Sequence, residues 1–137
     1  MKKDELQRYN GKEGKPRKGS KDMYLLVSVL EQTEHLPTIL ERFAKIGVTG
    51  TTIFDSSGMG RVLMKSGAEL PAKEKAKKVL IGRQSSNKTL FTVIKEKETL
   101  QEAINVIRSF CGDLNEPGKG ILFAFPLEYV EGLKEED

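Results

Sequence analysis

Apolar residues along this chain follow two patterns: short, nearly continuous runs in some segments and the spacing of an α-helix in others. Four apolar runs have the length of β-strands and are rich in β-branched and aromatic side chains; they span residues 23–30, 51–57, 89–94 and 121–127. The first of them (MYLLVSVL) is almost continuously apolar, which is typical of a central strand. We therefore expect a sheet of four strands.

Two segments between these strands have apolar residues at helical spacing. In the first, Thr33 can cap a helix, Pro37 falls in or just beyond its first turn, and Gly47 is placed to end it. The apolar face of this helix comprises Leu36, Ile39, Leu40, Phe43 and Ile46. The second helix is predicted over residues 98–111, ends at Gly112, and has an apolar face of Leu100, Ile104, Ile107 and Phe110. Each helix therefore has one face suited to covering a sheet.

The order of these elements, strand-helix-strand twice over, predicts the fold class. With right-handed crossovers, two such units form a four-stranded antiparallel sheet with both helices on one face, the ferredoxin-like βαββαβ arrangement of the α+β class. We place this domain at residues 23–133. The other face of the sheet would be uncovered, and an exposed apolar face normally finds a partner, so we expect an oligomer. The candidates for one face or the other are Tyr24, Leu26, Phe91 and Phe123.

Three segments fall outside these patterns. Residues 1–22 are poor in apolar side chains and rich in glycine and lysine, so we expect a flexible basic arm. Regular patterning also fails between the second and third strands, and a loop as long as 59–88 is usually functional or disordered; part of it, residues 72–80, could form a short helix on contact with a partner. The stretch that contains Tyr129 and Leu133 is predicted to form a short fraying helix, followed by an acidic tail at 134–137.

Composition narrows the classes of function. No run approaches the roughly 20 apolar residues of a membrane-spanning helix, and the N-terminus lacks the apolar centre of a secretory signal. The single cysteine, Cys111, cannot form an internal disulfide, so we expect a cytoplasmic location and a buried thiol. With one histidine, His35, and no nucleophile placed beside a base, the chain predicts neither a metal site nor an enzyme.

Charge is distributed unevenly although the net charge is only +3. Residues 1–22 carry eight basic and four acidic side chains, residues 61–88 carry eight basic and two acidic ones, and residues 128–137 are mainly acidic. The long loop contains a cluster formed by Lys73, Lys75, Lys77 and Lys78. Such a cluster is either a solvated face or a docking site for phosphates, an acidic protein, nucleic acid or a membrane surface.

A glycine-hinged turn ending in an arginine follows the second predicted strand (GVTGTTIFDSSGMGR, residues 47–61). Gly58 and Gly60 permit backbone torsions and a close ligand approach that other residues resist, and Arg61 could make bidentate contacts to a phosphate. A second glycine-rich turn would offer backbone donors and one cation, as in an anion-binding nest; its residues are Gly118, Lys119 and Gly120. The alternative, which needs no ligand, assigns Gly47 and Gly50 to chain reversals and Gly58 and Gly60 to loop hinges.

The chain from residue 23 to 133 resembles the PII nitrogen-regulatory and PII-like signalling proteins. The family's GVTGMT and GFGR stretches are matched by GVTGTT at residues 47–52 and GMGR at residues 58–61, and its GDGKIFV turn and strand by the GKG turn at residues 118–120. The resemblance implies a homotrimer of ferredoxin-like subunits that binds adenine nucleotides in the clefts between them. It also implies that the loop at 59–88 is a T-loop, which moves with ligand state and contacts transporters, enzymes or regulators.

The resemblance also implies roles for individual residues. Thr52 aligns with a threonine that recognises adenine, and Gly50 with a glycine whose backbone approaches the nucleotide; without the family, Thr52 would be assigned to strand propensity alone. The phosphates would lie between two glycine-rich turns, one from each of two neighbouring subunits. The residues that would contact them are Gly58, Gly60 and Arg61 of one turn and Gly118, Lys119 and Gly120 of the other. The lysine cluster of the long loop would dock the partner protein.

The chain departs from the family pattern at the positions that choose the ligand. Val62 stands where the family has a glutamine that helps to hold 2-oxoglutarate and its metal, so we do not expect this ligand to be sensed. Lys119 and Ile121 replace the aspartate and lysine of GDGK, and Glu116 aligns with the preceding phosphate-binding lysine. The C-terminal arginine pair is missing, and the loop has no tyrosine that could accept uridylylation. The fold and trimer therefore transfer from the family, whereas the ligand does not.

Three classes of function remain. The first is a cytoplasmic PII-like regulator whose effector is an adenine nucleotide (ATP, ADP or AMP) or a related small anion such as a cyclic nucleotide or bicarbonate, and whose partner is a target protein such as a membrane transporter. The second is a trimeric metal-tolerance or scaffold protein resembling CutA, which would not bind nucleotides. The third is a ferredoxin-like RNA reader, but the chain lacks the RNP pattern of aromatic residues on the sheet, so we do not expect nucleic acid as a partner.

Overall fold

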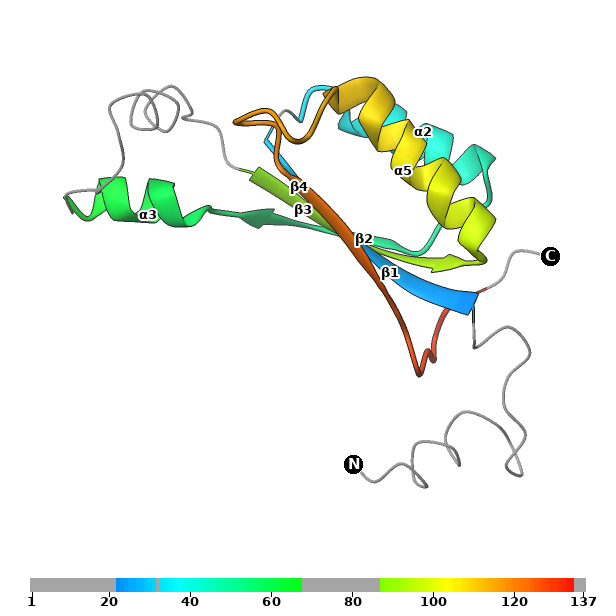
Figure 1. The fold of residues 1–137 in the computed structure, drawn as a ribbon. Helices are drawn as coiled ribbons and strands as arrows, with labels where there is room; N and C mark the ends of the chain where they lie inside the picture. The colour runs from blue at the N-terminus through cyan, green and yellow to red at the C-terminus, as the bar shows by residue number, and fades with distance from the viewer. Residues whose placement is uncertain (1–21, 32, 68–86, 135–137) are drawn as a thin grey trace.

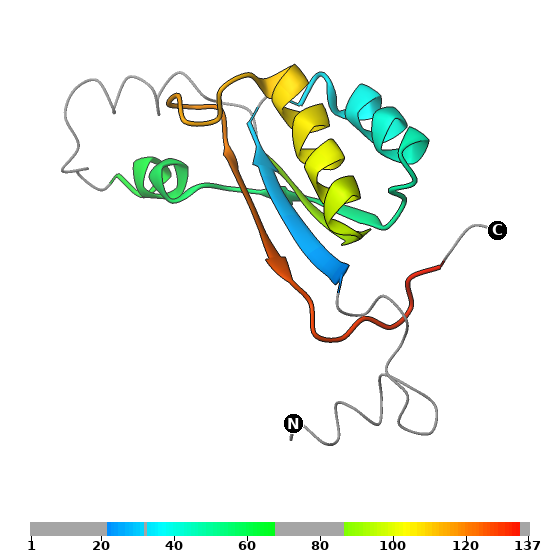
Figure 2. The same ribbon diagram turned by 45° about the vertical axis from the view of Figure 1, so that its right-hand side comes forward.

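A computed structural model describes residues 22–31, 33–67 and 87–134 of the chain. Its elements in chain order are β1 (Met23–Leu30), α2 (Leu36–Lys45), β2 (Thr51–Ser56), α3 (Met59–Lys65), β3 (Asn87–Lys95), α5 (Lys97–Cys111) and β4 (Ile121–Pro126). The four strands form one antiparallel sheet in the order β2-β3-β1-β4, and α2 and α5 lie side by side on one face (Figures 1 and 2). The predicted ferredoxin-like fold is confirmed, and most element ends lie within one or two residues of their expected positions.

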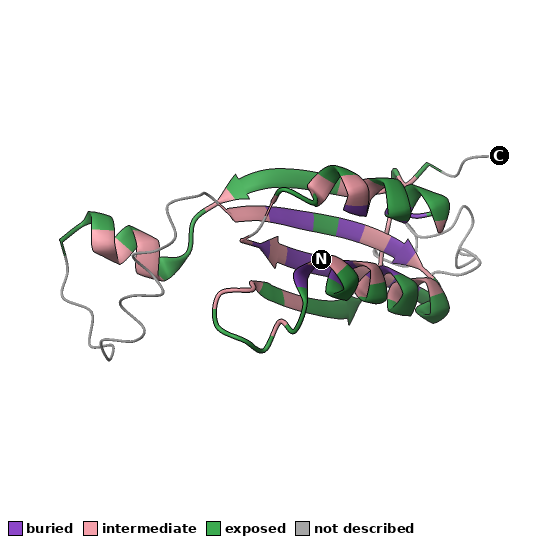
Figure 3. Cartoon of the chain, turned by 90° about the horizontal axis from the view of Figure 1, so that it is seen from above, coloured by how far each residue is buried: buried purple, intermediate pink, exposed green. Residues whose placement is uncertain are grey.

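The core lies between the sheet and the two helices. The central strands contribute Leu26, Leu30, Leu90 and Ile94, and the helices contribute Ile39, Phe43, Ala103 and Ile107; all eight are essentially inaccessible to solvent. Buried positions concentrate on the two central strands, whereas the two outer strands are largely exposed (Figure 3). Burying an aliphatic or aromatic side chain of this size contributes about 1.5–3 kcal/mol, so these residues hold the helices on the sheet.

In the described part of the chain no helix covers the second face of the sheet, which we call the open face (Figure 1). Side chains alternate along a strand: Leu26 points to the helices, while its neighbour Val27, which is paired with Phe91 and Phe123, points the other way. Exposed large apolar side chains of the open face are Phe54, Phe91, Ile121, Phe123 and Phe125. Phe54 and Phe91 meet edge to face, with ring centroids 5.1 Å apart. The open face is therefore an aromatic surface.

The start of the first helix differs from the prediction. Thr33 does not cap it; the helix begins at Leu36 behind His35, and the carbonyl oxygen of Thr33 accepts the N–H of Leu36 in the preceding turn. Pro37 explains the shift, since proline is tolerated only in the first turn and so fixes where the helix can start. The C-terminal prediction is confirmed, because Gly47 follows the helix with a φ of +83°.

Helix α3 is a second difference, since no regular structure was expected directly after Gly58. Its sequence, MGRVLMK, is made largely of good helix formers, and the N–H of Val62 donates to the carbonyl oxygen of Gly58 to close the first turn. The helix extends away from α2 and α5 (Figure 1). It buries no residue, so its sequence has no periodic apolar face from which a helix could be predicted. The lysine cluster and the expected helix at 72–80 lie outside the described residues, as does the N-terminal arm up to residue 21.

The C-terminal segment 127–134 is the third difference and forms no helix. The N–H of Leu127 donates to the carbonyl oxygen of Met23, and Gly132 adopts a φ of +93° that redirects the chain. A residue with this torsion ends a helix rather than continuing it, which is why the predicted fraying helix is absent. We call residues 127–134 the C-terminal strap. Within the described stretches, no helix has the length and apolarity needed to cross a membrane.

Candidate functional site

Both glycine-rich turns lie at the same end of the sheet. The strand register pairs Ser56 with Asn87 and Val29 with Ile121, so β2 ends and β4 begins at this end, which we call the loop end. The turns nevertheless lie on opposite edges, because β3 and β1 separate β2 from β4. Three strand spacings of about 4.8 Å place the edges about 14 Å apart. Within one chain, the two turns therefore do not converge on one small anion.

The turn beside β4 is built around close backbone contact. Gly118 and Gly120 have φ values of +85° and +105°, and a Cβ on Gly120 would lie 2.0 Å from the carbonyl oxygen of Val29. The fold alone therefore accounts for Gly120, since this position must be glycine whatever the turn binds. Next to the turn is a hollow of about 490 Å³, bordered by Arg108, Asn115 and Leu122 among others.

Lys119 lies near the end of α5, where its charge acts on Cys111. Burial raises the pKa of the Cys111 thiol, and the positive charge of Lys119 opposes this shift. Cys111 is 5% exposed, so the prediction of a buried thiol is confirmed.

The turn beside β2 has a different local structure from the expected hinge. Gly58 is extended, with a φ of −78°, and Gly60 lies inside α3; both conformations are open to other residues. A Cβ on Gly58 would meet Nδ2 of Asn87 at 3.8 Å, an ordinary contact. Arg61 is half-buried in α3. Glycine at position 58 is thus required neither by its backbone torsion nor by lack of space, and a close-approaching ligand is the reason we propose for it.

The base of the long loop is held by polar side chains on both faces of the sheet. On the helix side, Nζ of Lys88 donates to Oδ1 of Asp55 in an ion pair. On the open face, the hydroxyls of Ser56 and Thr89 share a hydrogen bond of 2.6 Å. The two strand ends therefore remain together where the chain leaves the sheet and where it returns.

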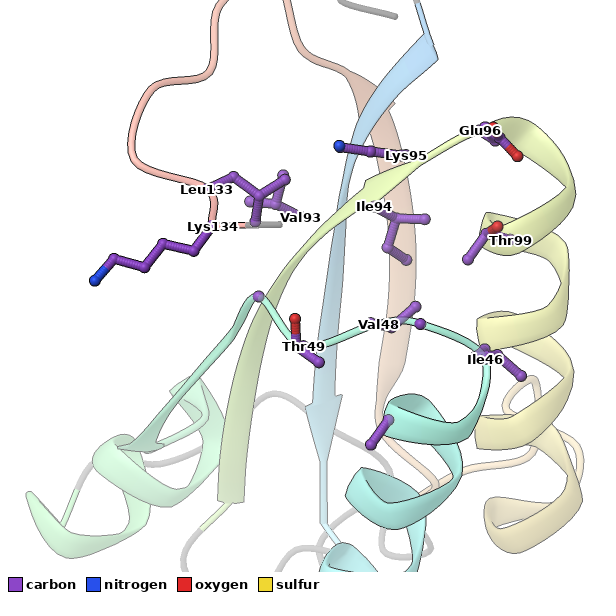
Figure 4. A pocket seen from close by; sticks show the side chains of 13 residues that line it. Ile46, Val48, Thr49, Val93, Ile94, Lys95, Glu96, Thr99, Leu133 and Lys134 are labelled. Carbon is purple, nitrogen blue, oxygen red and sulfur yellow. The ribbon is translucent and has the colours of Figure 1, made fainter. Parts of the chain in front are cut away.

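Another hollow lies at the opposite end of the sheet, which we call the strap end. A pocket of about 510 Å³ is enclosed by the loop between α2 and β2, the end of β3, the first turn of α5 and the C-terminal strap (Figure 4). Its polar side chains come from Thr49, Lys95, Glu96, Thr99 and Lys134. Two lysines and one glutamate leave the lining positive, which favours an anionic ligand.

Gly50 forms part of this strap-end pocket. Its carbonyl oxygen accepts the N–H of Val93 at 3.0 Å, and a Cβ at position 50 would lie 2.7 Å from Cδ1 of Leu133. Thr52 lies two residues further along β2, opposite Phe91, and is exposed on the open face. The structure thus brings Gly50 and Thr52 to one face of β2 and adds the strap, which the sequence had assigned to a fraying helix and, from residue 134, to an acidic tail.

Glu96 at the rim of the pocket has an uncommon backbone conformation. It is the residue before α5 and has φ 69° and ψ 140°, a region that non-glycine residues rarely occupy and that costs about 1–3 kcal/mol. Its N–H donates to the carbonyl oxygen of Asp22 at 2.7 Å, which helps to hold it. Sequence patterns give no signal for such a residue, because the strain arises from the junction of β3 with α5.

The arrangement offers no metal-binding cluster within the three described stretches, where no group of three or more His, Cys, Asp or Glu side chains is close enough to hold an ion. What it offers is basic side chains at both ends of the sheet, with Lys119 at the loop end and Lys95 and Lys134 at the strap end. This chemistry suits the binding of an anion.

The fold places the chain among ferredoxin-like domains, and its two described hollows lie at the two ends of the sheet. Residues 23–137 match the family model described as nitrogen regulatory protein P-II, and the chain belongs to this family. Its members are regulatory proteins, so the chain is a PII-like signalling protein in the broad sense. Among curated proteins, none is similar enough in sequence to count as a match.

Solved structures share the fold at low sequence identity. PII from Arabidopsis thaliana bound to citrate is 19% identical, with a TM-score of 0.51 over 78% of each chain. GlnK from B. subtilis in complex with ATP is 14% identical, with a TM-score of 0.53 over 79% of this chain and 84% of that one. A functionally unknown protein from Pediococcus pentosaceus is 15% identical, with a TM-score of 0.52 over 82% and 99%.

Proposed function

We propose that this protein is a trimeric PII-type regulator that binds an adenine nucleotide, or a related small anion, between subunits and signals to a target protein through residues 57–86. The observation that carries the proposal is the separation of the two glycine-rich turns onto opposite edges of one sheet. Arg61 follows the β2 edge and Lys119 precedes the β4 edge, and these two edges are about 14 Å apart on the basis of strand spacing. They can share a ligand only if the β2 edge of one subunit meets the β4 edge of the next.

The open face supports the oligomer. Exposed aromatic side chains on one face, such as Phe91 and Phe123 at 42% and 46% exposure, form the kind of apolar surface that normally marks an interface. A second or third copy with the same surface would cover it. Membership of the P-II family supports the same arrangement and the regulatory role.

The choice of ligand class follows from charge and from relatives. GlnK from B. subtilis has been solved with ATP and Arabidopsis PII with citrate, both anions. In this chain we propose that Gly50 and Thr52 lie near the adenine of the nucleotide. The proposed contacts to its phosphates are Gly58, Gly60, Arg61, Gly118, Lys119 and Gly120. Val62 is 55% exposed and apolar, so it offers nothing to 2-oxoglutarate. We therefore propose a nucleotide sensor that does not read 2-oxoglutarate.

Signalling would run through the segment that leaves the sheet at the loop end. Ligand contact at Arg61 would reposition α3 and, with it, the chain that follows, which includes Lys73, Lys75, Lys77 and Lys78. Four lysines would suit an acidic patch on a target such as a membrane transporter. We place the protein in the cytoplasm, where a single reduced thiol is expected.

Calorimetry with ATP, ADP, AMP and a cyclic nucleotide tests the proposal. We expect at least one of them to bind, and we expect R61A and K119A each to weaken binding at least tenfold, since each removes a charge-assisted contact to phosphate. K97A, an exposed lysine at the start of α5, is the matched control and should bind like the parent. A trimer that binds none of the nucleotides would overturn the nucleotide proposal and favour the scaffold alternative resembling CutA.

A further inference from the structure

Leu133 of the C-terminal strap occupies the space that Gly50 leaves by having no side chain. Cδ1 of Leu133 lies 2.7 Å from the position of a Cβ on Gly50, closer than any real Cβ contact, so a side chain at position 50 and Leu133 exclude each other. Cβ of Val93 lies 3.8 Å from the same position. Figure 4 shows Leu133 beside Val93, directed from the strap toward β3. The three residues form a slot with Leu133 seated in it.

The strap is attached firmly at its start and lightly at its end. The N–H of Leu127 donates to the carbonyl oxygen of Met23 at 2.8 Å, which continues the pairing of β4 with β1. Gly132, with its φ of +93°, turns the chain so that Leu133 faces the sheet. Leu133 itself is only half-buried, and Lys134 beside it is exposed. A glycine hinge followed by one modest apolar anchor is a geometry that can open without disturbing the core.

The seat of Leu133 coincides with the place that the proposed function gives to the ligand. If the backbone of Gly50 is approached by a nucleotide, the approach runs through the slot that Leu133 fills. Two occupants cannot share this space at once. The nucleotide and Leu133 therefore compete for Gly50.

We propose that the C-terminal strap is a lid on the strap-end pocket and that Leu133 is its latch. The inference rests on the proposed function, which places the nucleotide at Gly50. A protein that must open before binding has its apparent affinity reduced by the fraction that is open. Because Leu133 is half-buried, we expect the closed strap to lower the affinity for the nucleotide about tenfold, which corresponds to about 1.4 kcal/mol.

Two lysines flank the latch. Lys95 at the end of β3 and Lys134 on the strap both line the pocket, and in Figure 4 the amine of Lys95 points toward the strap while that of Lys134 points away from the pocket. An anion that approaches this mouth is attracted to both charges. Part of the positive charge at this mouth therefore lies on the lid itself and would move with it.

Calorimetry with ATP on L133A tests the lid. Truncation of the latch should strengthen ATP binding about tenfold, because the closed state loses its anchor. V130A is the matched control: it removes apolar atoms from the same strap at a position that does not line the pocket, and its affinity should equal that of the parent. Weaker or unchanged binding by L133A would overturn the proposal, since Leu133 would then be a wall of the site or irrelevant to it.

A second measurement does not depend on any nucleotide. Cys111 is the single cysteine, so a C111A V93C protein carries one thiol beneath the latch, and its reaction with a small thiol reagent reports how often the strap opens. Adding L133A should raise the labelling rate at least tenfold, and adding V130A should not. If no variant binds ATP, the nucleotide proposal fails and labelling alone judges the lid; an L133A rate equal to the parent rate rejects it.

Discussion

Gly120 lies against the backbone of Val29, so close that a Cβ at position 120 would be 2.0 Å from the carbonyl oxygen of Val29. Val29 is paired with Ile121 across the β1–β4 ladder, so this contact fixes how the chain enters the last strand. A residue that family resemblance assigns to the ligand is therefore first required by the fold.

This contact predicts a sharp difference between two glycines. G120A should lower the free energy of unfolding by about 3 kcal/mol or more, or prevent folding, because it adds both an unfavourable φ and a backbone clash. G58A should change stability by less than about 1 kcal/mol, since Gly58 has a φ of −78° and room for a methyl group. Urea unfolding of both variants checks the prediction, and similar losses for the two would contradict it.

The strain at Glu96 predicts a stabilising substitution. E96G relieves a φ of 69° combined with a ψ of 140°, which glycine adopts readily, at the cost of greater freedom in the unfolded chain. We expect a net gain of about 1 kcal/mol. E96A is the control, because it removes the carboxylate and keeps the strain; thermal or urea unfolding of the pair measures the difference. A gain in E96A equal to that in E96G would assign the effect to charge instead.

The aromatic open face predicts how the proposed trimer can be dissociated. F123D places a charge among the aromatic side chains of this face, on the edge strand β4, and should convert the proposed trimer to monomers that keep the far-UV spectrum of the parent. M59E puts a charge on α3, at a side chain that is 79% exposed, and should leave the trimer intact. Light scattering coupled to size-exclusion chromatography provides the masses. A monomeric parent, or a trimeric F123D, would show that the open face is not the interface.

The buried thiol predicts a loss of stability in alkaline solution. Burial raises the pKa of Cys111 above its ordinary value of 9.0, so the unfolded chain releases this proton at a lower pH than the folded one. The stabilising contribution is complete below pH 9.0 and is lost as the pH rises from there through the folded pKa. C111A should flatten the decline in the free energy of unfolding above that pH relative to the parent. Parallel slopes for the two proteins would argue against it.

The parts of the fold that the sequence predicted are those that bury a periodic apolar face. Phe43 and Ile107 recur at helical spacing because both helices pack on the sheet, and MYLLVSVL is continuous because β1 lies in the centre. Helix α3 escaped prediction for the opposite reason: it buries no residue, so nothing in its pattern distinguishes it from a loop.

The sequence predicted only those residues of the candidate site that belong to a glycine-containing motif. Gly50 could be recognised from its family position, but the pairing of Gly50 with Leu133 joins residues far apart in the sequence and depends on how the strap folds back. Lys134 likewise counted as part of an acidic tail, although it lines the strap-end pocket beside Lys95. The strain at Glu96 also arises only after β3 and α5 are joined. Contacts of this kind have no local signature.

The hydrogen bond between the hydroxyls of Ser56 and Thr89 joins the end of β2 to the start of β3, the two strands that flank residues 57–86. Because the ends of this excursion are held on adjacent strands, its length hardly matters to the domain: doubling it would cost only about 0.6 kcal/mol of chain entropy. The pairing of β2 with β3 therefore allows segments of different length and charge to be inserted between these strands while the core stays the same. For the proposed regulator, a change of target protein would therefore require changes in this single stretch of chain only.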